Sequence, residues 1–238
     1  MEIRVSNCEY EMNNATTDLV PITSINYKNK FKTKIESIIK RTLDIIGGIV
    51  GVIALIPTTI LIYIANLIVK DKGPIFFTQE RIGKNGKPFK MYKYRSMVLG
   101  ADEKLKEYLQ ENEEARKEYK KYKKLKYDPR ITKVGAFIRK TSIDELPQLI
   151  NVLRGDMSLV GPRPYLPREK EDMKYYYPYI IQSKPGLTGF WQISGRNEVT
   201  FDERLDMDYM YNKYRCLNKD IKILIKTVLK VIKKEGAS

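Results

Sequence analysis

A run of 25 uncharged, mostly apolar residues at 45–69 constrains this chain more than any other feature. As one helix it would extend about 37 Å, enough to cross a hydrocarbon core of roughly 30 Å. A plain transmembrane helix is therefore one interpretation. However, Pro57 interrupts the helical hydrogen bonds at the middle of the run, and lysine or arginine flanks both of its ends. These features favour a re-entrant membrane helix-hairpin over residues 38–72, with both ends cytoplasmic.

The rest of the chain predicts a monotopic, mostly helical α/β protein. Residues 1–37 read as a loosely structured leader with an amphipathic lead-in, and residues 73–238 as a small cytosolic catalytic domain. Alternating apolar residues around the Gly83–Gly86 turn predict two short strands. Residues 101–127 predict a charged helix, and residues 220–234 a basic amphipathic helix at the membrane interface.

Composition narrows the chemistry further. The chain has no histidine, which excludes Ser-His and Cys-His nucleophile pairs, His-bound zinc and imidazole acid–base catalysis. Its formal net charge of +15 predicts an anionic partner: nucleic acid, acidic lipid headgroups or a phosphorylated substrate. The apolar run favours anionic membrane lipids and a phosphorylated substrate, with no nucleic acid.

Residues 139–164, RKTSIDELPQLINVLRGDMSLVGPRP, hold the densest set of candidate catalytic groups. Asp144 and Glu145 are adjacent, so on a helix they do not face each other and cannot share one proton. The spacing Ser142-x-x-Glu145 fits a capping box, which would place both acids at a helix N-terminus. Such an end keeps a carboxylate ionised and offers N–H groups to phosphate, so Asp144 there is ready to attack phosphorus.

This stretch resembles the central signature of the bacterial sugar transferases, the monotopic polyprenyl-phosphate hexose-1-phosphate transferases. The resemblance continues over roughly residues 38–232. It implies an enzyme that transfers hexose-1-phosphate from a UDP-sugar, galactose or glucose, to undecaprenyl phosphate. The products would be undecaprenyl-diphosphate-sugar and UMP, and the reaction would initiate a polysaccharide or related glycan. The chain resembles the short form of the family.

The resemblance also implies a location and partners. The protein is expected at the bacterial inner membrane, with its catalytic domain on the cytoplasmic face, and a homodimer is one expected assembly. Two alternatives from other classes are a non-catalytic membrane-tethered scaffold of polysaccharide assembly and a membrane-tethered nucleic-acid binder.

Catalytic roles follow from the same resemblance. Asp144 matches the family's nucleophile, which forms a sugar-phosphoryl aspartate, and Glu145 matches its partner. A diphosphate substrate implies Mg²⁺ as cofactor, bound by a carboxylate and phosphate oxygens, with Asp144 and Asp156 as candidate ligands.

Other positions match substrate-binding elements of the family. A guanidinium group binds phosphate oxygens through paired hydrogen bonds, so arginines in these elements are candidates for phosphate binding. For Arg139, the alternative is an ordinary surface charge with no substrate contact. The candidate phosphate-binding residues are Arg139, Arg163 and Arg196. Core packing is the alternative for Trp191, which could otherwise stack on a base. The candidate residues of the nucleotide or sugar pocket are Lys184, Gly189, Trp191, Gln192 and Asp208.

The membrane segment departs from the family pattern. The resembled proteins break their re-entrant helix at a Ser-Pro pair, whereas this chain has Ile56-Pro57 followed by Thr58 and Thr59. If the break is kept, a threonine hydroxyl has to satisfy the carbonyl that Pro57 leaves without a donor.

Overall fold

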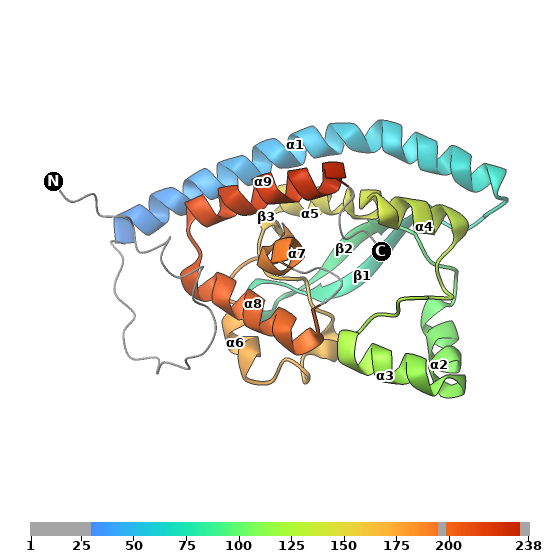
Figure 1. Ribbon diagram of the computed structural model, residues 1–238. Helices are drawn as coiled ribbons and strands as arrows, with labels where there is room; N and C mark the ends of the chain where they lie inside the picture. The colour runs from blue at the N-terminus through green and yellow to red at the C-terminus, as the bar shows by residue number, and fades with distance from the viewer. Residues whose placement is uncertain (1–29, 195–198, 234–238) are drawn as a thin grey trace.

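A computed structural model describes residues 30–194 and 199–233 (Figure 1). Helix α1 (Lys30–Ile68) arches along one side of a domain formed by all the later elements. The predicted leader falls mainly on residues 1–29, which lie outside the described residues. Its amphipathic lead-in forms the first part of α1.

Helix α1 continues through Pro57 with a gentle curve, so the predicted break into a two-part hairpin is wrong for this structure (Figure 1). Hydroxyl groups bind the carbonyls of the turn that precedes the proline. Thr58 Oγ1 donates to the Ala54 carbonyl at 2.8 Å, and Thr59 Oγ1 donates to the Leu55 carbonyl at 2.6 Å. The threonine hydroxyls support the helix near the proline, but the carbonyls they bind are not that of Ile53, the one that Pro57 leaves without a helical donor.

The other elements form two small sheets packed among helices. Strands β1 (Phe76–Ile82) and β2 (Pro88–Tyr94) pair antiparallel around the 3₁₀ turn η2 (Lys84–Gly86), which confirms the predicted strand pair. Strands β3 (Ser158–Val160) and β4 (Gly186–Thr188) pair in parallel. The remaining elements are α2 (Ala101–Glu111), α3 (Glu113–Tyr122), α4 (Lys133–Lys140), η3 (Ile143–Glu145), α5 (Gln148–Arg154), η4 (Pro167–Glu169), η5 (Lys174–Tyr176), α6 (Tyr177–Ile180), α7 (Phe190–Ser194), α8 (Phe201–Tyr214) and α9 (Leu217–Lys233).

The charged segment at 101–127 is two helices, not the single helix that its composition predicts. Helix α2 ends at Asn112, whose backbone is extended there. The Asn112 side chain accepts a hydrogen bond from the Ala115 N–H at 2.9 Å and so starts α3 as an N-cap.

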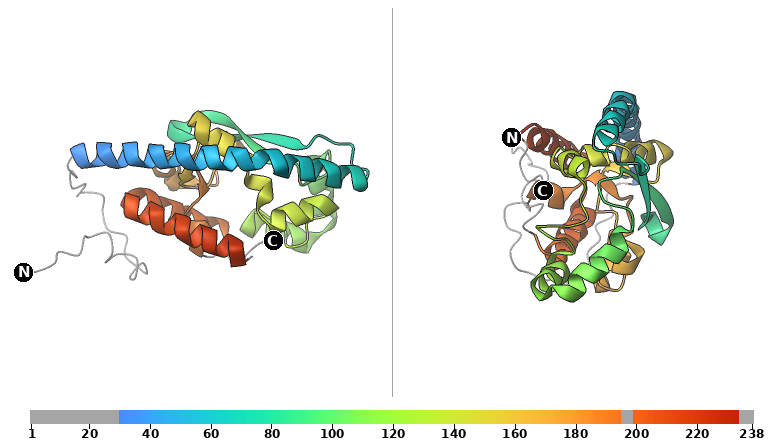
Figure 2. Two further views of the ribbon diagram at one scale, coloured as in Figure 1. Left: turned by 90° about the horizontal axis from the view of Figure 1, so that it is seen from above. Right: turned by 90° about the vertical axis from the view of Figure 1, so that its right-hand side faces the viewer.

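Apolar side chains cover the outward face of α1. This helix is long and apolar enough to cross a membrane. Helix α9 lies on the same side of the domain as α1 (Figures 1 and 2) and adds exposed apolar side chains of its own. The large exposed residues include Ile46, Ile49, Val50, Ile53, Ile56, Ile60, Leu61, Leu67 and Ile68 of α1 and Ile225, Val228, Leu229 and Ile232 of α9. An exposed apolar surface of this kind indicates membrane association.

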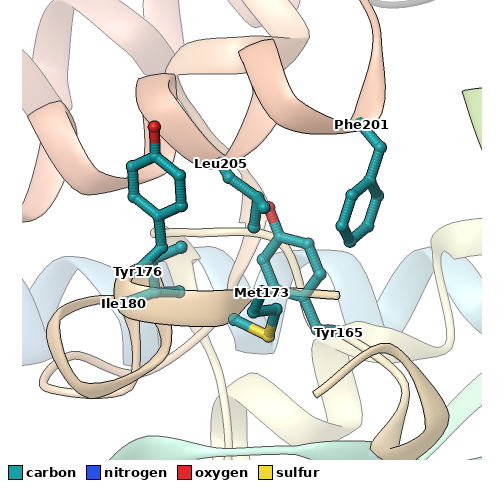
Figure 3. Close-up of a cluster of buried hydrophobic side chains, with 6 residues drawn as sticks. All are labelled: Tyr165, Met173, Tyr176, Ile180, Phe201 and Leu205. Carbon is teal, nitrogen blue, oxygen red and sulfur yellow. The ribbon is translucent and has the colours of Figure 1, made fainter. Parts of the chain in front are cut away.

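Buried apolar clusters hold the domain together. One cluster joins Leu55 and Ile62 of α1 to Tyr94 of β2 and Ile138 of α4, so it packs the apolar helix onto the domain. Another lies beneath α8 (Figure 3). Its members are Tyr165, Met173, Tyr176, Ile180, Phe201 and Leu205.

Three charged residues in the N-terminal half of α1 also fix it to the domain. Arg41 donates to the Val152 and Leu153 carbonyls, at 2.7 and 2.8 Å, and so caps the end of α5. Lys40 pairs with Asp220 of α9 at 2.7 Å. Asp44 is buried and accepts hydrogen bonds from β3.

We expect Asp44→Ala to destabilise the domain. The Asp44 carboxylate accepts from Ser158 Oγ at 3.0 Å and from the Leu159 N–H at 2.8 Å. Removing it leaves two buried donors without an acceptor, which costs about 2 kcal/mol of unfolding free energy. Circular dichroism of the purified protein should show a lower melting temperature. Glu107→Ala, an exposed change in the middle of α2, is the control, and equal melting temperatures for both variants would contradict the proposed anchor.

Candidate active site

Asp144 and Glu145 lie in the 3₁₀ turn η3, directly before α5. The predicted capping box is wrong, because Ser142 adopts a left-handed conformation with φ 57° and its side chain caps no N–H group. Helix α5 instead begins after Pro147. The two acids therefore precede the helix, held between α4 and α5.

Lys93 of strand β2 faces both acids. Its Nζ lies 2.8 Å from Glu145 Oε1 and 3.9 Å from Asp144 Oδ2. Sequence analysis did not single out Lys93, since it belongs to no motif and is one of 44 lysines and arginines. Pairing of β1 with β2 is the only signal that could have directed attention to its strand.

Burial controls the charge of Asp144. Only 8% of the residue is exposed, and this desolvation raises the pKa of its carboxyl from 3.8 to about 6, while the charges of Lys93 and Arg139 oppose the rise. The expectation of a carboxylate kept ionised by a helix N-terminus is thus corrected. Asp144 is ionised mainly above about pH 6, and the charges of Lys93 and Arg139 favour that form.

Arg163 lies in a separate group of side chains with Trp191 of α7 and Arg204 of α8. The guanidinium carbons of Arg163 and Arg204 lie 5.7 and 4.7 Å from the Trp191 ring centroid. Both are cation–π contacts. Trp191 therefore packs against cations and not in an apolar core cluster. Arg196 lies outside the described residues.

Asp208 is hydrogen-bonded to the backbone of the loop that carries Arg163. It is completely buried, and its Oδ2 accepts from the Arg163 backbone N–H at 2.9 Å and from the Tyr165 hydroxyl at 2.8 Å. Burial raises the pKa of the Asp208 carboxyl to about 7. Asp208 is therefore placed to fix the loop that carries Arg163 and not to line an open pocket.

Gly189 allows the chain to pass very close to that loop. A Cβ at this position would lie 2.2 Å from the Gly161 carbonyl oxygen and 2.9 Å from Gln192 Oε1. No larger residue fits without moving the backbone. Gly189 thus packs closely against Gly161 and Gln192, and the nucleotide or sugar pocket predicted for Gly189 and Gln192 stays a prediction.

Lys184 and Asp156 lie elsewhere. Lys184 Nζ is near Gly155, at the C-terminal end of α5, where burial and the charge of Arg41 lower the pKa of its ammonium group. Asp156 Oδ2 contacts Asn151 Nδ2 at 3.3 Å and Arg154 Nε at 3.7 Å. Neither side chain is brought together with Asp144 or Trp191 by the contacts of the described residues.

The same geometry decides which metal ligands fit. Asp144 and Asp156 lie beyond opposite ends of the seven-residue helix α5, which is about 10 Å long, so they do not share one ion. Within residues 30–194 and 199–233, no group of three aspartate, glutamate or cysteine side chains is placed to hold a metal ion. A site for Mg²⁺ with Asp144 and substrate phosphate oxygens fits, because Mg²⁺ commonly binds one or two carboxylates together with phosphates. The prediction of Asp156 as a ligand is wrong on this geometry.

Comparison with known proteins identifies the class of this fold and site. Residues 35–234 match the family model described as bacterial sugar transferase. The chain belongs to that family, which confirms the resemblance predicted from its sequence.

Several known proteins are similar to this chain. The undecaprenyl-phosphate galactose phosphotransferase of Salmonella typhimurium is 46% identical over 213 residues, covering 90% of this chain and 44% of that protein. Galactosyl transferase CpsE of Streptococcus agalactiae is 46% identical over 90% of this chain and 46% of its own length. Exopolysaccharide production protein ExoY of Sinorhizobium fredii is 41% identical over 85% of this chain and 89% of its length. The chain thus spans about half the length of the first two.

Lys93 should set the pH dependence of Asp144. If Asp144 acts as an ionised nucleophile, the rate of sugar-phosphate transfer should rise with pH through a midpoint near 6. Lys93→Gln removes the strongest charge that lowers the pKa of Asp144, so this midpoint should move up by about one pH unit. Initial rates across a pH series measure it. Lys90→Gln, an exposed change on the same strand, should leave the midpoint in place, and no shift in Lys93→Gln would contradict the assignment.

Proposed function

We propose that this protein transfers hexose-1-phosphate from a UDP-sugar to undecaprenyl phosphate and so initiates polysaccharide or related glycan synthesis. One observation carries the proposal: a buried aspartate, Asp144, lies beside the ammonium group of Lys93 in a family of sugar transferases. Carboxylate nucleophiles with this kind of charge control suit covalent phosphoryl transfer.

The reaction takes place in two steps. In the first, an ionised oxygen of Asp144 attacks the phosphorus that bears the sugar. A P–O bond to the carboxylate forms, the P–O bond to the bridging oxygen breaks, and UMP leaves with that electron pair. In the second, an anionic oxygen of undecaprenyl phosphate attacks the same phosphorus, and the Asp144 carboxylate leaves. The products are undecaprenyl-diphosphate-sugar and UMP.

Neighbouring groups have distinct tasks in this scheme. Lys93 favours the ionised form of Asp144, and Glu145 holds the Lys93 ammonium group through its 2.8 Å contact. Arg139 contributes positive charge at the same carboxylate. Mg²⁺, when bound by Asp144 and phosphate oxygens, would neutralise charge on the diphosphate.

The sugar is proposed to be galactose, with glucose as the second choice. Support comes from the names of the relatives, two of which are described as galactose or galactosyl transferases. A panel of UDP-sugars assayed for UMP release tests this choice directly.

The covalent step predicts a burst. Without lipid, the wild-type protein should release at most one UMP per molecule from the donor, because the sugar-phosphate stays on Asp144. Asp144→Asn should abolish the burst and the matching mass increment on the intact protein, since an amide oxygen is a poor nucleophile. Rapid-quench assays and mass spectrometry measure the two quantities.

Glu145→Gln is the matched comparison for that experiment. It should slow turnover but leave Asp144 able to accept the sugar-phosphate. UMP release that depends strictly on lipid, with ternary-complex kinetics, would rule out the aspartyl intermediate even if the transfer itself took place.

We also propose that α1 enters the cytoplasmic membrane without exposing either end to the outside. Support comes from its apolar outward face and from the positive residues at both ends of the apolar run. The alternative, a spanning helix, remains compatible with its length.

Cysteine labelling distinguishes these topologies. Lys34→Cys and Lys72→Cys lie on the two sides of the run and are exposed. In a background with Cys8→Ser and Cys216→Ser, both should react with a membrane-impermeant reagent in inside-out vesicles and neither in intact spheroplasts. Labelling of one position from outside would establish a spanning helix.

A further inference from the structure

Two arginines from different parts of the chain, Arg163 and Arg204, contact the Trp191 ring, and Arg81 lies near Arg163. Arg81 comes from β1, Arg163 from the loop after β3, and Arg204 from α8. Arg81 and Arg204 are only 8% and 3% exposed. Such burial is costly for a cation unless it is paired.

Polar atoms in this group are buried without partners. Among the described residues, six side-chain atoms have no hydrogen-bond partner although solvent does not reach them, and all six belong to this group. They are Nε of Arg81, Nε of Arg163, Nε of Arg204, Nε1 of Trp191, Oε1 of Gln192 and Oδ1 of Asp208. Four of the six are N–H donors, which an anionic ligand is able to satisfy.

The charges here are also out of balance. Burial and the charge of Arg163 lower the pKa of Arg81 to about 9 and that of Arg204 to about 10, so the arginines repel one another. Two buried carboxylates, Asp208 and Glu169, stand nearby, and both already accept backbone N–H groups. The site therefore favours an anion.

The three arginines differ in their hydrogen bonds. Arg81 is bonded to the protein, whereas Arg163 and Arg204 are available to bind a ligand. Arg81 donates to the Pro164 carbonyl at 2.9 Å and to Gln79 Oε1 at 2.6 Å, so it holds the loop that contains Arg163. Within the described part of the chain, no hydrogen bond or ion pair engages the guanidinium groups of Arg163 or Arg204. Each guanidinium group instead lies over the Trp191 ring.

We propose that Arg163 and Arg204 together bind the diphosphate of the nucleotide-sugar donor against the face of Trp191, with Arg81 as a positioning residue. The inference rests on the proposed function and adds Arg204, from α8, to the substrate-binding residues. Two guanidinium forks match two linked phosphate groups better than a single phosphate ester.

The position of α8 favours the donor over the lipid as the source of that phosphate. Helix α8 lies on the side of the domain away from α1 (Figures 1 and 2). A water-soluble nucleotide reaches that side freely, whereas the phosphate of a polyprenyl chain enters from the apolar surface of α1 and α9.

Trp191 gives a direct readout, because it is the single tryptophan of the chain. Titrating the wild-type protein with UDP should change its fluorescence saturably, and inorganic pyrophosphate should displace UDP. UMP should bind at least about tenfold more weakly, because it lacks one of the two phosphate groups.

Arg204→Lys should weaken UDP binding by at least about tenfold, because an ammonium group cannot reproduce the paired hydrogen bonds. Arg116→Lys, an exposed change in α3, is the control and should bind UDP like the wild type. Circular dichroism verifies that each variant is folded. If Arg204→Lys does not fold, the UDP affinity of Arg163→Lys and the competition of pyrophosphate with UDP in the wild type test the inference instead.

Two outcomes would overturn the inference: equal UDP affinity in Arg204→Lys and wild type, or failure of pyrophosphate to compete in the wild type. Equal UDP affinity together with weaker binding of undecaprenyl phosphate in Arg204→Lys would assign the arginines to the lipid phosphate. UDP binding that depends on Arg204 without turnover of any UDP-hexose would retain the anion site and reject the proposed transferase reaction.

Discussion

The contact between α1 and α5 is the constraint on which the rest of the structure depends. Arg41 of α1 caps the C-terminal carbonyls of α5, and the N-terminal end of α5 follows the turn that holds Asp144. A charged side chain in the polar half of a long apolar helix therefore fixes the candidate catalytic turn. Lys40 and Asp44 extend the attachment to α9 and β3, so the apolar helix is part of the domain's framework.

The candidate site contains two groups of charged residues with different electrostatics, one around Asp144 and one around Trp191. At Asp144, burial raises the carboxyl pKa and one lysine opposes it, which keeps a nucleophile close to its ionisation midpoint near neutral pH. Around Trp191, two buried arginines and the half-buried Arg163 outnumber two buried carboxylates, and in our proposal an anion completes their hydrogen bonds. The first arrangement suits bond formation, and the second suits binding, which is the division of labour that phosphoryl transfer from a diphosphate requires.

Local patterns predicted local structure well. The turn at Gly83–Gly86 and the terminal amphipathic helix were correct, because alternation and helical periodicity depend on nearby residues. The predicted hairpin at Pro57 was wrong because hydroxyl groups support a continuous helix there. Those of Thr58 and Thr59 belong to α1 itself, and that of Tyr94 comes from the distant strand β2. Lys93 and Arg204 were missed for the same reason: their roles arise from long-range packing, which leaves no motif. Asp156 follows Asp144 by 12 positions, but α5 holds the two apart.

The central claim is a double displacement at phosphorus with Asp144 as the intermediate carrier, and stereochemistry tests it most directly. A UDP-galactose donor with a chiral thiophosphate at the sugar-bearing phosphorus would be converted to the lipid-linked product, and the configuration of that phosphorus determined. Each in-line displacement inverts the centre, so two successive displacements predict net retention. Net inversion would mean that undecaprenyl phosphate attacks the donor directly, and it would contradict the account.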